Sequence, residues 1–457
     1  MLTFSHALKS EPWINTSDLQ LRSDIELLSD IGVIKVPITT YPLMWAGIIK
    51  DIENTDIQNV AADYKAVYWR VKKSGKAALL NKPKRLLNAS VASSEQLFRS
   101  FGDSNRGKAE LTASSANLSK LFAWNLQVNR ISDPLDGDTF NYDGSYVAAV
   151  WGNWIASVGK VEKWWGASWD SANLLSNNAR PPVGVTLNRN YSDPSQLPVL
   201  QWLGPWSFTG FVSQLDDTRR FENPTLSGVS MSFKPLDSLE TSIRATAISG
   251  GTARQFNPNI SAKILTGFDM RWRLPFHSMP ISFYFSTTDE GYDNGFSTGQ
   301  FGVSWNINVF DNNWRVFLEA TDTVAGGSPP NRFNATYEDG IYVEGYRLNQ
   351  RAIGSTYDND SNVISIGLIG SLSRYQTFSA KFQKLDINAR EAESVLDARH
   401  SINQNFVEAK RFIAKWQIQA DKNNQFEVEL DYSNKVIDGF GRQNEEYRLA
   451  VGWKYYL

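Results

Sequence analysis

The feature that most constrains this chain is a two-residue rhythm of apolar and polar residues, which runs from about residue 85 to the end. In the last stretch, EEYRLAVGWKYYL, one side carries Tyr447, Leu449, Val451, Trp453, Tyr455 and Leu457, and the other carries Arg448, Ala450, Gly452, Lys454 and Tyr456. Side chains of an extended strand point alternately to its two faces. The last strand therefore needs an apolar environment on one side and a polar one on the other.

The same rhythm recurs in several long segments. They include FEVELDY at 426–432, SLETSIRATA at 238–247, AKILTGFDMRWRL at 262–274 and FGVSWNINV at 301–309. A β-sandwich seldom strings so many long strands in series, whereas about 9 to 11 tilted residues are what a strand needs to cross a bilayer. The pattern predicts an all-β transmembrane fold, a single closed antiparallel β-barrel that is apolar outside and polar inside.

Short and long connections alternate along this part of the chain. GN at 152–153, KPLD at 234–237 and DKN at 421–423 are short, and the connections between them are long. Outer-membrane barrels have short periplasmic turns and long external loops. The predicted strands begin near residues 85, 108, 121, 145, 154, 183, 200, 227, 238, 261, 280, 299, 314, 363, 375, 405, 423 and 445, about 18 in all, with a further hairpin expected within 322–362.

The first 83 residues have a helical period instead. Ser17 with Gln20, and Thr55 with Gln58, have the spacing of capping boxes, and Pro42 can begin a third helix. We expect two parts: a small α-helical bundle at 1–83, which caps or plugs the periplasmic end, and an outer-membrane barrel at 84–457.

Composition excludes several classes of protein. With 46 Lys+Arg against 48 Asp+Glu the formal net charge is -2, so the chain has no overall basic footprint for nucleic acid, and binding of a polyanion would need a local patch. The chain has no Cys, which excludes disulfides and thiolate chemistry. No run of 18 apolar residues predicts a membrane-spanning helix. The start, MLTFSHALKS, lacks the pattern of a signal peptide, so we expect a mature outer-membrane protein given a new start Met.

The densest aromatic and polar run, KWWGASWDSANLLSNNARPP, lies in a connection that the strand count makes external and that we expect to fold back into the barrel. Trp164, Trp165 and Trp169 stand there with Asn177 and Arg180. Indole faces beside amide and guanidinium groups suit a sugar, which stacks its C–H face and directs its hydroxyls. The alternative is that these tryptophans pack the connection into the lumen and hold it shut. The further glycan-binding candidates in the loops are Tyr142, Tyr292, Tyr337, Tyr346 and Arg351.

Signals for catalysis are weak. The only histidines are His6, His277 and His400, and the pair His400-Ser401 is adjacent in sequence alone. A hydrolase would need His beside Ser and a carboxylate in space. No glycine-rich phosphate loop or metal-spaced His pair occurs. We therefore expect no catalytic residue, metal or cofactor, and keep two alternatives to glycan binding: an outer-membrane pore, passive or substrate-selective, and a barrel enzyme that uses His400.

Several segments together resemble the capsule assembly Wzi family of Gram-negative outer membranes. They are LRSDIELLSDIGVIKVPITTYPL, DGSYVAAVWGNWIASVGKVEKWWG, KWWGASWDSANLLSNNARPP and LPVLQWLGPWSFTGFVSQLDD. The resemblance implies an eighteen-stranded barrel with a periplasmic helical bundle, and a lectin-like role in which exported capsular polysaccharide is held at the cell surface. The implied partners are capsular polysaccharide, outer-membrane lipid and the capsule export machinery, with the protein acting as a monomer. The family offers no catalytic motif to carry over.

Overall fold

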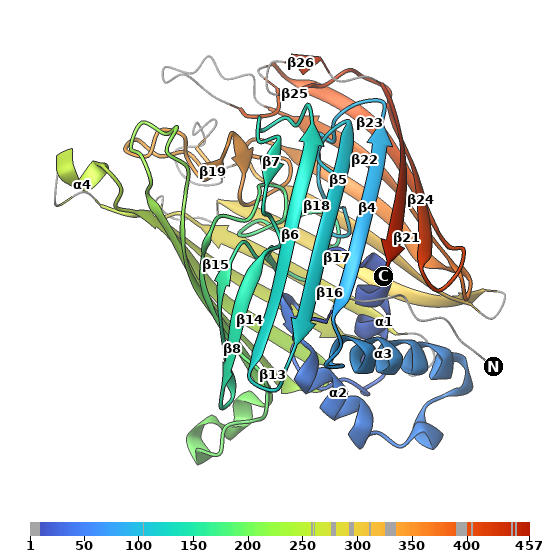
Figure 1. Cartoon of the computed structure of the whole chain (residues 1–457). Coiled ribbons are helices and arrows are strands. Elements are labelled where there is room, and N and C mark those ends of the chain that lie inside the picture. The colour runs from blue at the N-terminus through green and yellow to red at the C-terminus, as the bar shows by residue number, and fades with distance from the viewer. Residues whose placement is uncertain are drawn as a thin grey trace.

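Antiparallel strands pair in sequence order around a closed ring, and the last strand, β27 (Tyr447–Tyr456), pairs with the first, β4 (Lys84–Ala92) (Figure 1). The computed structural model describes residues 10–103, 105–256, 259, 261–275, 280–291, 297–309, 312–324, 335–389, 400–403, 405–439, 442–443 and 446–457. Because β7 (Phe140–Asn141) and β8 (Tyr146–Trp151) pair one after the other with β6, they are two pieces of one strand, and the ring has 18 strands. The fold class predicted from the alternation is confirmed.

The remaining ring strands follow the chain without crossovers. They are β5 (Ala109–Leu118), β6 (Phe122–Ser132), β9 (Trp154–Gly159), β11 (Gly184–Arg189), β12 (Trp206–Gln214), β13 (Thr225–Leu236), β14 (Leu239–Ser249), β15 (Lys263–Arg273), β16 (Ile281–Asp289), β17 (Thr298–Val309), β18 (Asn312–Asp322), β21 (Asn362–Ser373), β22 (Gln376–Ile387), β23 (Val407–Gln419) and β24 (Asn424–Ser433). The expected extra hairpin is β19 (Arg347–Leu348) with β20 (Arg351–Ala352), outside the ring.

All but two of the ring strands begin within two residues of the positions predicted from the sequence. One exception is the strand expected near 145, whose first piece, β7, begins at Phe140, although its second piece, β8, begins at Tyr146. The other is the strand expected near 200, where the chain forms η3 (Pro198–Leu203) and β12 begins only at Trp206. Pro198 starts this 3₁₀ helix, and Gly204, at φ 66°, turns the chain before Pro205. The apolar run 197–203 predicts a strand, but Pro198, Gly204 and Pro205 make it a short helix followed by a turn.

The two faces of the strands have the predicted polarity. On β27, Tyr447 and Leu449 are 59% and 53% exposed on the outside, whereas Arg448 is 4% exposed and points inward. The same holds on β14, where Ile243 faces out and Glu240 faces in. An apolar outer face with a charged inner face is the arrangement of a lipid-embedded barrel. Among the described helices, none is both long and apolar enough to cross a membrane.

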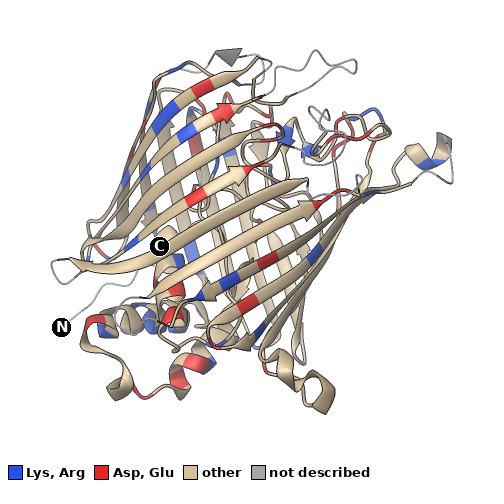
Figure 2. Cartoon of the chain, turned by 180° about the vertical axis from the view of Figure 1, so that it is seen from behind, with Lys and Arg blue, Asp and Glu red and all other residues tan. Residues whose placement is uncertain are grey.

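The N-terminal residues form α1 (Leu19–Asp30), α2 (Trp45–Asn54) and α3 (Lys65–Ala78), with two short turns, η1 (Ile57–Asn59) and η2 (Ala62–Tyr64), before α3. They lie at the rim of short turns, opposite the long loops (Figure 1), and carry many of the charges seen in Figure 2. The predicted caps are displaced by one residue: Asp18, not Ser17, caps α1, and Asp56, not Thr55, caps η1. A carboxylate has taken the position that a hydroxyl was expected to hold.

Helix α1 is buried on all sides because it enters the lumen. Its apolar residues Ile25 and Leu28 pack in the core of the helical bundle. Its polar face meets the inner wall: Asp30 lies 2.5 Å from Arg271 of β15, and Arg315 of β18 donates to the Ser23 carbonyl at 3.2 Å. A helical pattern that normally marks a solvent-exposed face here marks contact with a charged barrel wall.

Candidate functional site

The connection between β9 and β11, residues 160–183, runs through the lumen; we call it the plug segment. Within it, β10 (Trp164–Trp165) pairs antiparallel with β2 (Thr40–Tyr41) of the N-terminal part. Trp165 also bridges Leu175. The tryptophan-rich connection therefore folds back into the barrel, as the sequence predicted, and joins the helical bundle there through backbone hydrogen bonds.

Two carboxylates of the barrel wall hold inserted backbone in the same way. Glu240 of β14 accepts the N–H groups of Ile38 and Thr39 at 3.0 and 2.9 Å. Glu319 of β18 accepts the N–H groups of Trp169 and Asp170 at 2.6 and 3.0 Å. A buried N–H without a partner is costly, and a carboxylate can satisfy two at once. The wall thus fixes both inserted segments by their main chains.

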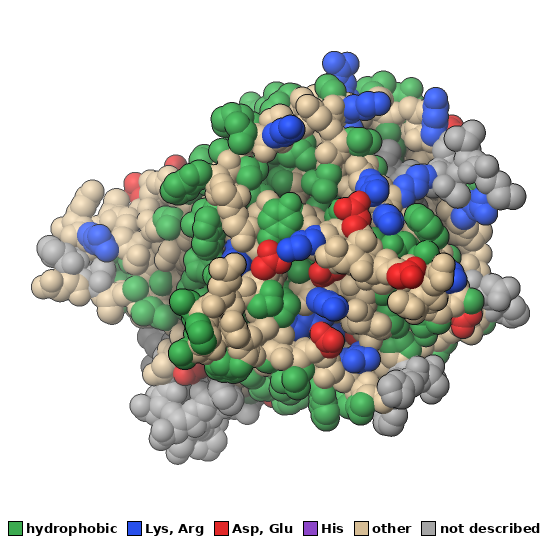
Figure 3. Space-filling view, turned by 90° about the horizontal axis from the view of Figure 1, so that it is seen from below, with side chains coloured by type: hydrophobic (Ala, Val, Ile, Leu, Met, Phe, Trp, Pro, Cys, Tyr) green, Lys and Arg blue, Asp and Glu red, His purple; other side chains and the backbone are tan. Residues whose placement is uncertain are grey.

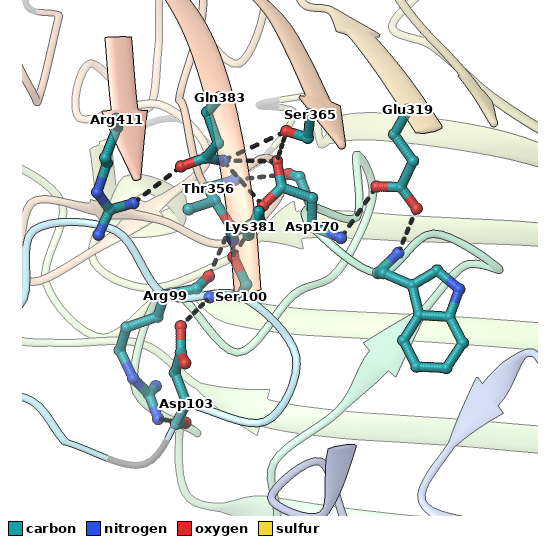
Figure 4. A network of polar contacts seen from close by, with 12 residues as sticks. Arg99, Ser100, Asp103, Asp170, Glu319, Thr356, Ser365, Lys381, Gln383 and Arg411 are labelled. Carbon is teal, nitrogen blue, oxygen red and sulfur yellow. Dashed lines mark hydrogen bonds and ion pairs between the residues drawn. The ribbon is translucent and has the colours of Figure 1, made fainter. Parts of the chain in front are cut away.

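Asp170 is the centre of the polar network in the plug segment (Figure 4). The donors to its side chain are Ser100, Tyr357, Ser365, Lys381 and Gln383, at 2.5 to 3.0 Å. They come from the connection after β4, from the long connection before β21, and from β21 and β22 of the wall. Burial alone would raise the pKa of Asp170, but Lys381 and these donors outweigh it and lower the pKa. One charged carboxylate therefore ties three parts of the interior together.

The three predicted glycan-contacting tryptophans are closed off from solvent. Trp164 and Trp165 are 0% exposed and Trp169 is 2% exposed. Trp164 packs edge-on against Phe101, and Trp169 stacks on Phe317 and on the guanidinium of Arg22, which lies 4.2 Å from its ring centroid. In this conformation the indoles fill the lumen, which is the packing alternative that the sequence left open.

Residues 335–361 form a layer above the plug segment at the long-loop end; we call it the roof. Arg351 donates to Leu97 O at 2.8 Å and to Asn178 Oδ1 at 2.7 Å, so it joins the roof, the connection after β4 and the plug segment. Tyr337 donates to Asn173 O, and Tyr346 donates to Leu174 O. Of the predicted site residues, Tyr337 and Tyr346 stack on each other with ring centroids 5.9 Å apart, and Arg351 is buried in the same layer.

The other predicted site residues have different surroundings. Asn177 is buried and donates to Ser100 O at 3.2 Å. Arg180 is buried between Asp136 and Asp143, at 2.6 and 2.8 Å. The remaining two differ from these: Tyr142 is 51% exposed beside Phe140 on the outer face of the barrel, and Tyr292 lies outside the described residues.

Both ring nitrogens of His400 are engaged by main chain. Its Nε2 donates to Asn359 O at 2.8 Å, and its Nδ1 accepts the N–H groups of Ile402 and Asn403 at 3.2 Å each. The hydroxyl of Ser401 donates to Asp358 and not to the imidazole. These contacts form a clasp between the roof and residues 400–403. Ser361 Oγ lies 3.5 Å from Nε2, but in this arrangement Nε2 carries the proton that it donates to Asn359 O, so it is not placed to act as the base for that serine.

A cavity in the lumen has room for a ligand or for water. This cavity, of about 250 Å³, lies between the N-terminal segment and the wall formed by β4, β5, β6, β24 and β27. Among the residues that line it are Asn129, Arg180, Gln425, Lys454 and Tyr146. In the part of the chain that the structure describes, no group of His, Asp and Glu has the arrangement of a metal site.

Sequence reasoning missed the wall partners of the plug segment. Lys381 and Gln383 are alternate residues of β22, and their polar character at inward positions was the available signal. Arg22 and Arg99, both 1% exposed, were missed because they lie in segments without a two-residue rhythm. The sequence shows which side chains of a strand point into the lumen. It does not show which residues they contact there.

Comparisons with known proteins agree with this architecture. An uncharacterised 55.8 kDa protein in the cps region of Klebsiella pneumoniae is 25% identical over 332 residues, which are 65% of this chain and 64% of that protein. The chain thus matches slightly less than two thirds of that relative's length. The solved structure of Wzi from Escherichia coli, described as an outer-membrane protein involved in group 1 capsule assembly and as a carbohydrate-binding β-barrel, superposes with a TM-score of 0.84 at 21% identity.

That superposition covers 96% of this chain and 98% of the other, so the two share the whole fold, including the inserted N-terminal part. The model of the capsule assembly protein Wzi family matches residues 80–448, which is most of the chain. The family resemblance predicted from the sequence is confirmed, and the chain belongs to the capsule assembly protein Wzi family.

Proposed function

We propose that this outer-membrane barrel binds exported capsular polysaccharide at the cell surface and supports assembly of the capsule layer there. The observation that carries the proposal is membership of the capsule assembly family over residues 80–448. The carbohydrate-binding description of the Escherichia coli relative, which has the same fold, supports it. A repeating polymer can be held by many weak contacts to such a surface.

In this proposal the glycan contacts the outer side of the roof, and the predicted site residues support the roof from its inner side. Trp164, Trp165, Trp169, Asn177, Arg180, Tyr337, Tyr346 and Arg351 are buried, so their contribution is to fix the shape of the roof and the plug segment. Tyr142 is the described candidate with an exposed ring. A rigid, internally bonded cap presents its surface groups in one arrangement, which lowers the ordering cost of binding.

The filled lumen favours a binding protein over a pore. Helix α1, the plug segment and the roof are packed one above another between the two rims, tied to the wall by Glu240, Glu319 and Asp170. We propose further that the protein acts as a monomer without catalysis, with the helical bundle on the periplasmic side as a cap that the capsule export machinery can contact.

Binding of polysaccharide to the purified protein in nanodiscs tests the proposal directly. Capsular polysaccharides of different charge are compared with an uncharged dextran, and binding of at least one capsular polymer is expected. Arg351→Ala should weaken binding because it disconnects the roof from Leu97 and Asn178. Arg254→Ala, at an exposed position, is the control and should bind normally. If no capsular polymer binds and cells lacking the protein retain their capsule unchanged, the proposal fails.

A further inference from the structure

The connection between β11 and β12, residues 190–205, is long although it lies at the rim of short turns; we call it the rim loop. It contains η3 and hangs below the barrel edge next to β8, to one side of α2 (Figure 1). Its position at the perimeter differs from that of the helical bundle, which covers the lumen. The rim loop therefore lies directly below the outer wall of the barrel.

The tip of the rim loop is apolar and exposed. Leu197, Val199 and Trp202 are 62%, 78% and 68% exposed, and Leu200 is 39% exposed. In a 3₁₀ helix residues three apart lie in line, so Val199 and Trp202 form one ridge and Leu197 and Leu200 form the next. Single exposed apolar residues are ordinary, but two adjacent ridges on one short helix are a surface that requires a partner.

The base of the rim loop holds this tip in place. Lys50 of α2 lies 2.5 Å from Asp193, and Arg189 donates to Trp206 O at 2.6 Å with its guanidinium 3.8 Å from the Trp206 ring centroid. Lys234 N donates to Pro205 O at 2.9 Å, which joins the loop to the end of β13. The contacts at its base thus fix the apolar tip in position relative to the barrel.

Charge and continuity identify the partner as lipid. No Asp, Glu, Lys or Arg occurs from Pro194 to Leu215, so the tip itself carries no charge, and the charged residues Lys50, Arg189 and Asp193 lie at the base of the loop. A protein-docking patch usually has a polar rim of its own. The exposed apolar surface continues onto the barrel through Leu236, which is 60% exposed at the end of β13, and Trp151, 85% exposed at the end of β8. Seen from this end, hydrophobic side chains line much of the left and lower edges, charges of both signs gather across the middle, and further Lys and Arg side chains lie along the upper edge (Figure 3).

We propose that the rim loop is an interfacial anchor, which lays Leu197, Val199, Leu200 and Trp202 into the headgroup region of the periplasmic leaflet beside the barrel. Tryptophan is favoured at that depth because its ring is apolar and its N–H can meet polar groups. An anchor at one point of the perimeter fixes the depth of the barrel and its rotation relative to the membrane plane. This goes beyond the proposed function and does not depend on glycan binding.

Site-specific fluorescent labelling tests this proposal. The chain has no Cys, so one introduced Cys gives a single labelling site. Val199→Cys carries an environment-sensitive fluorophore in vesicles of phosphatidylethanolamine and phosphatidylglycerol. Lys422→Cys, in the polar turn between β23 and β24 at the same rim, is the water-exposed control, and Phe301→Cys on the outer face of β17 is the lipid-exposed control. All three positions are on the surface, so the variants should fold like the parent.

The label at Val199 should be quenched by lipid nitroxides near the headgroup more than by nitroxides deep in the acyl chains, and by aqueous iodide at least ~3-fold less than the label at Lys422. Equal iodide quenching at Val199 and Lys422, with normal lipid quenching at Phe301, would overturn the proposal while leaving the barrel in its membrane. Shielding of Val199 in permeabilised cells but not in vesicles would also overturn it, and would assign the rim loop to a periplasmic protein.

Discussion

Lys163 carries the least compensated charge of the plug segment. Burial lowers its pKa from 10.5 to about 8. Among the described residues its ammonium has one hydrogen-bond acceptor, Val161 O at 3.2 Å, and it lies 4.7 Å from the Phe211 ring centroid. A buried charge of this kind costs stability unless it is paired. The position is therefore a place where the native residue weakens the fold.

Lys163→Met should raise the melting temperature at pH 7, because it keeps the length of the side chain and removes the ammonium. The folded pKa of about 8 lies below the unfolded 10.5, so the penalty is complete below pH 8 and disappears as the pH rises to 10.5. It amounts to about 3 kcal/mol by the usual linkage relation. Heat-induced unfolding in detergent measures it. Lys120→Met, at an exposed turn, is the control; a gain for Lys163→Met that persisted above pH 10.5 would contradict the explanation.

Asp170→Asn should loosen the interior more than any surface substitution. The amide would remove the charge that pairs with Lys381, and would present N–H groups to donors. Breaking one side of a buried pair costs about 3 kcal/mol. The melting temperature should fall, and proteases should cut the roof faster than in the parent.

A double-mutant cycle separates the pair from the rest of the network. Adding Lys381→Met to Asp170→Asn should recover part of the loss, with a coupling of about 1 to 3 kcal/mol, since the unpaired ammonium is then gone. Strictly additive losses in the two single variants and the double variant would show that Asp170 acts without Lys381.

The strands of the wall were predictable because the alternation of apolar and polar residues within each strand shows which side chains face out and which face in. Glu240 and Ile243 on β14, and Arg448 and Leu449 on β27, point as their alternation requires. The filling of the lumen was not predictable in the same way. Asp170 meets Lys381 across 211 residues of sequence, and no local pattern names that partner. The tryptophans were correctly placed in an inserted connection, but whether they faced sugar or protein depended on these distant contacts.

The roof is an element whose closure should depend on pH through His400. Burial lowers the pKa of His400 from 6.5, so the closed roof favours neutral imidazole. Nearby Asp358 opposes this shift and nearby Arg347 adds to it. The clasp is at full strength above pH 6.5 and weakens as the pH falls below it, because an opened roof takes up the proton more readily. Protonation would also abolish the acceptor for Ile402 N and Asn403 N.

Hydrogen exchange of residues 355–361 and 400–403 at pH 7.5 and pH 5 measures this closure, with rates corrected for the intrinsic effect of pH. Exchange in these segments should rise at pH 5 relative to the ring strands. His400→Asn should exchange faster at both pH values and lose the extra increase. An equal increase in the parent and in His400→Asn would assign the effect to another group, such as Glu338, whose pKa is raised by burial.

At the scale of the whole molecule, the barrel wall and the plug segment are one mechanical unit. Eighteen strands around a ring leave space for an aqueous channel, and here that space holds α1, the plug segment and the roof. Glu240 and Glu319 fix the inserted main chain at two heights through hydrogen bonds. No disulfide supports these contacts, because the chain has no Cys. Occlusion therefore rests on buried polar contacts that a small number of substitutions can remove.

Conductance in a planar bilayer tests this unit. The parent protein should show no large steady conductance, whereas Glu240→Ala combined with Glu319→Ala should show intermittent openings, because four inserted N–H groups lose their acceptors. Replacing residues 162–178 by a short Gly-Ser linker gives a reference without most of the plug segment, called the unplugged reference, in which α1 and the roof remain and β9 and β11 still pair with each other. A steady conductance of the parent equal to that of the unplugged reference would show that the inserted segments do not seal the barrel, and would restore the pore as the better description of its function.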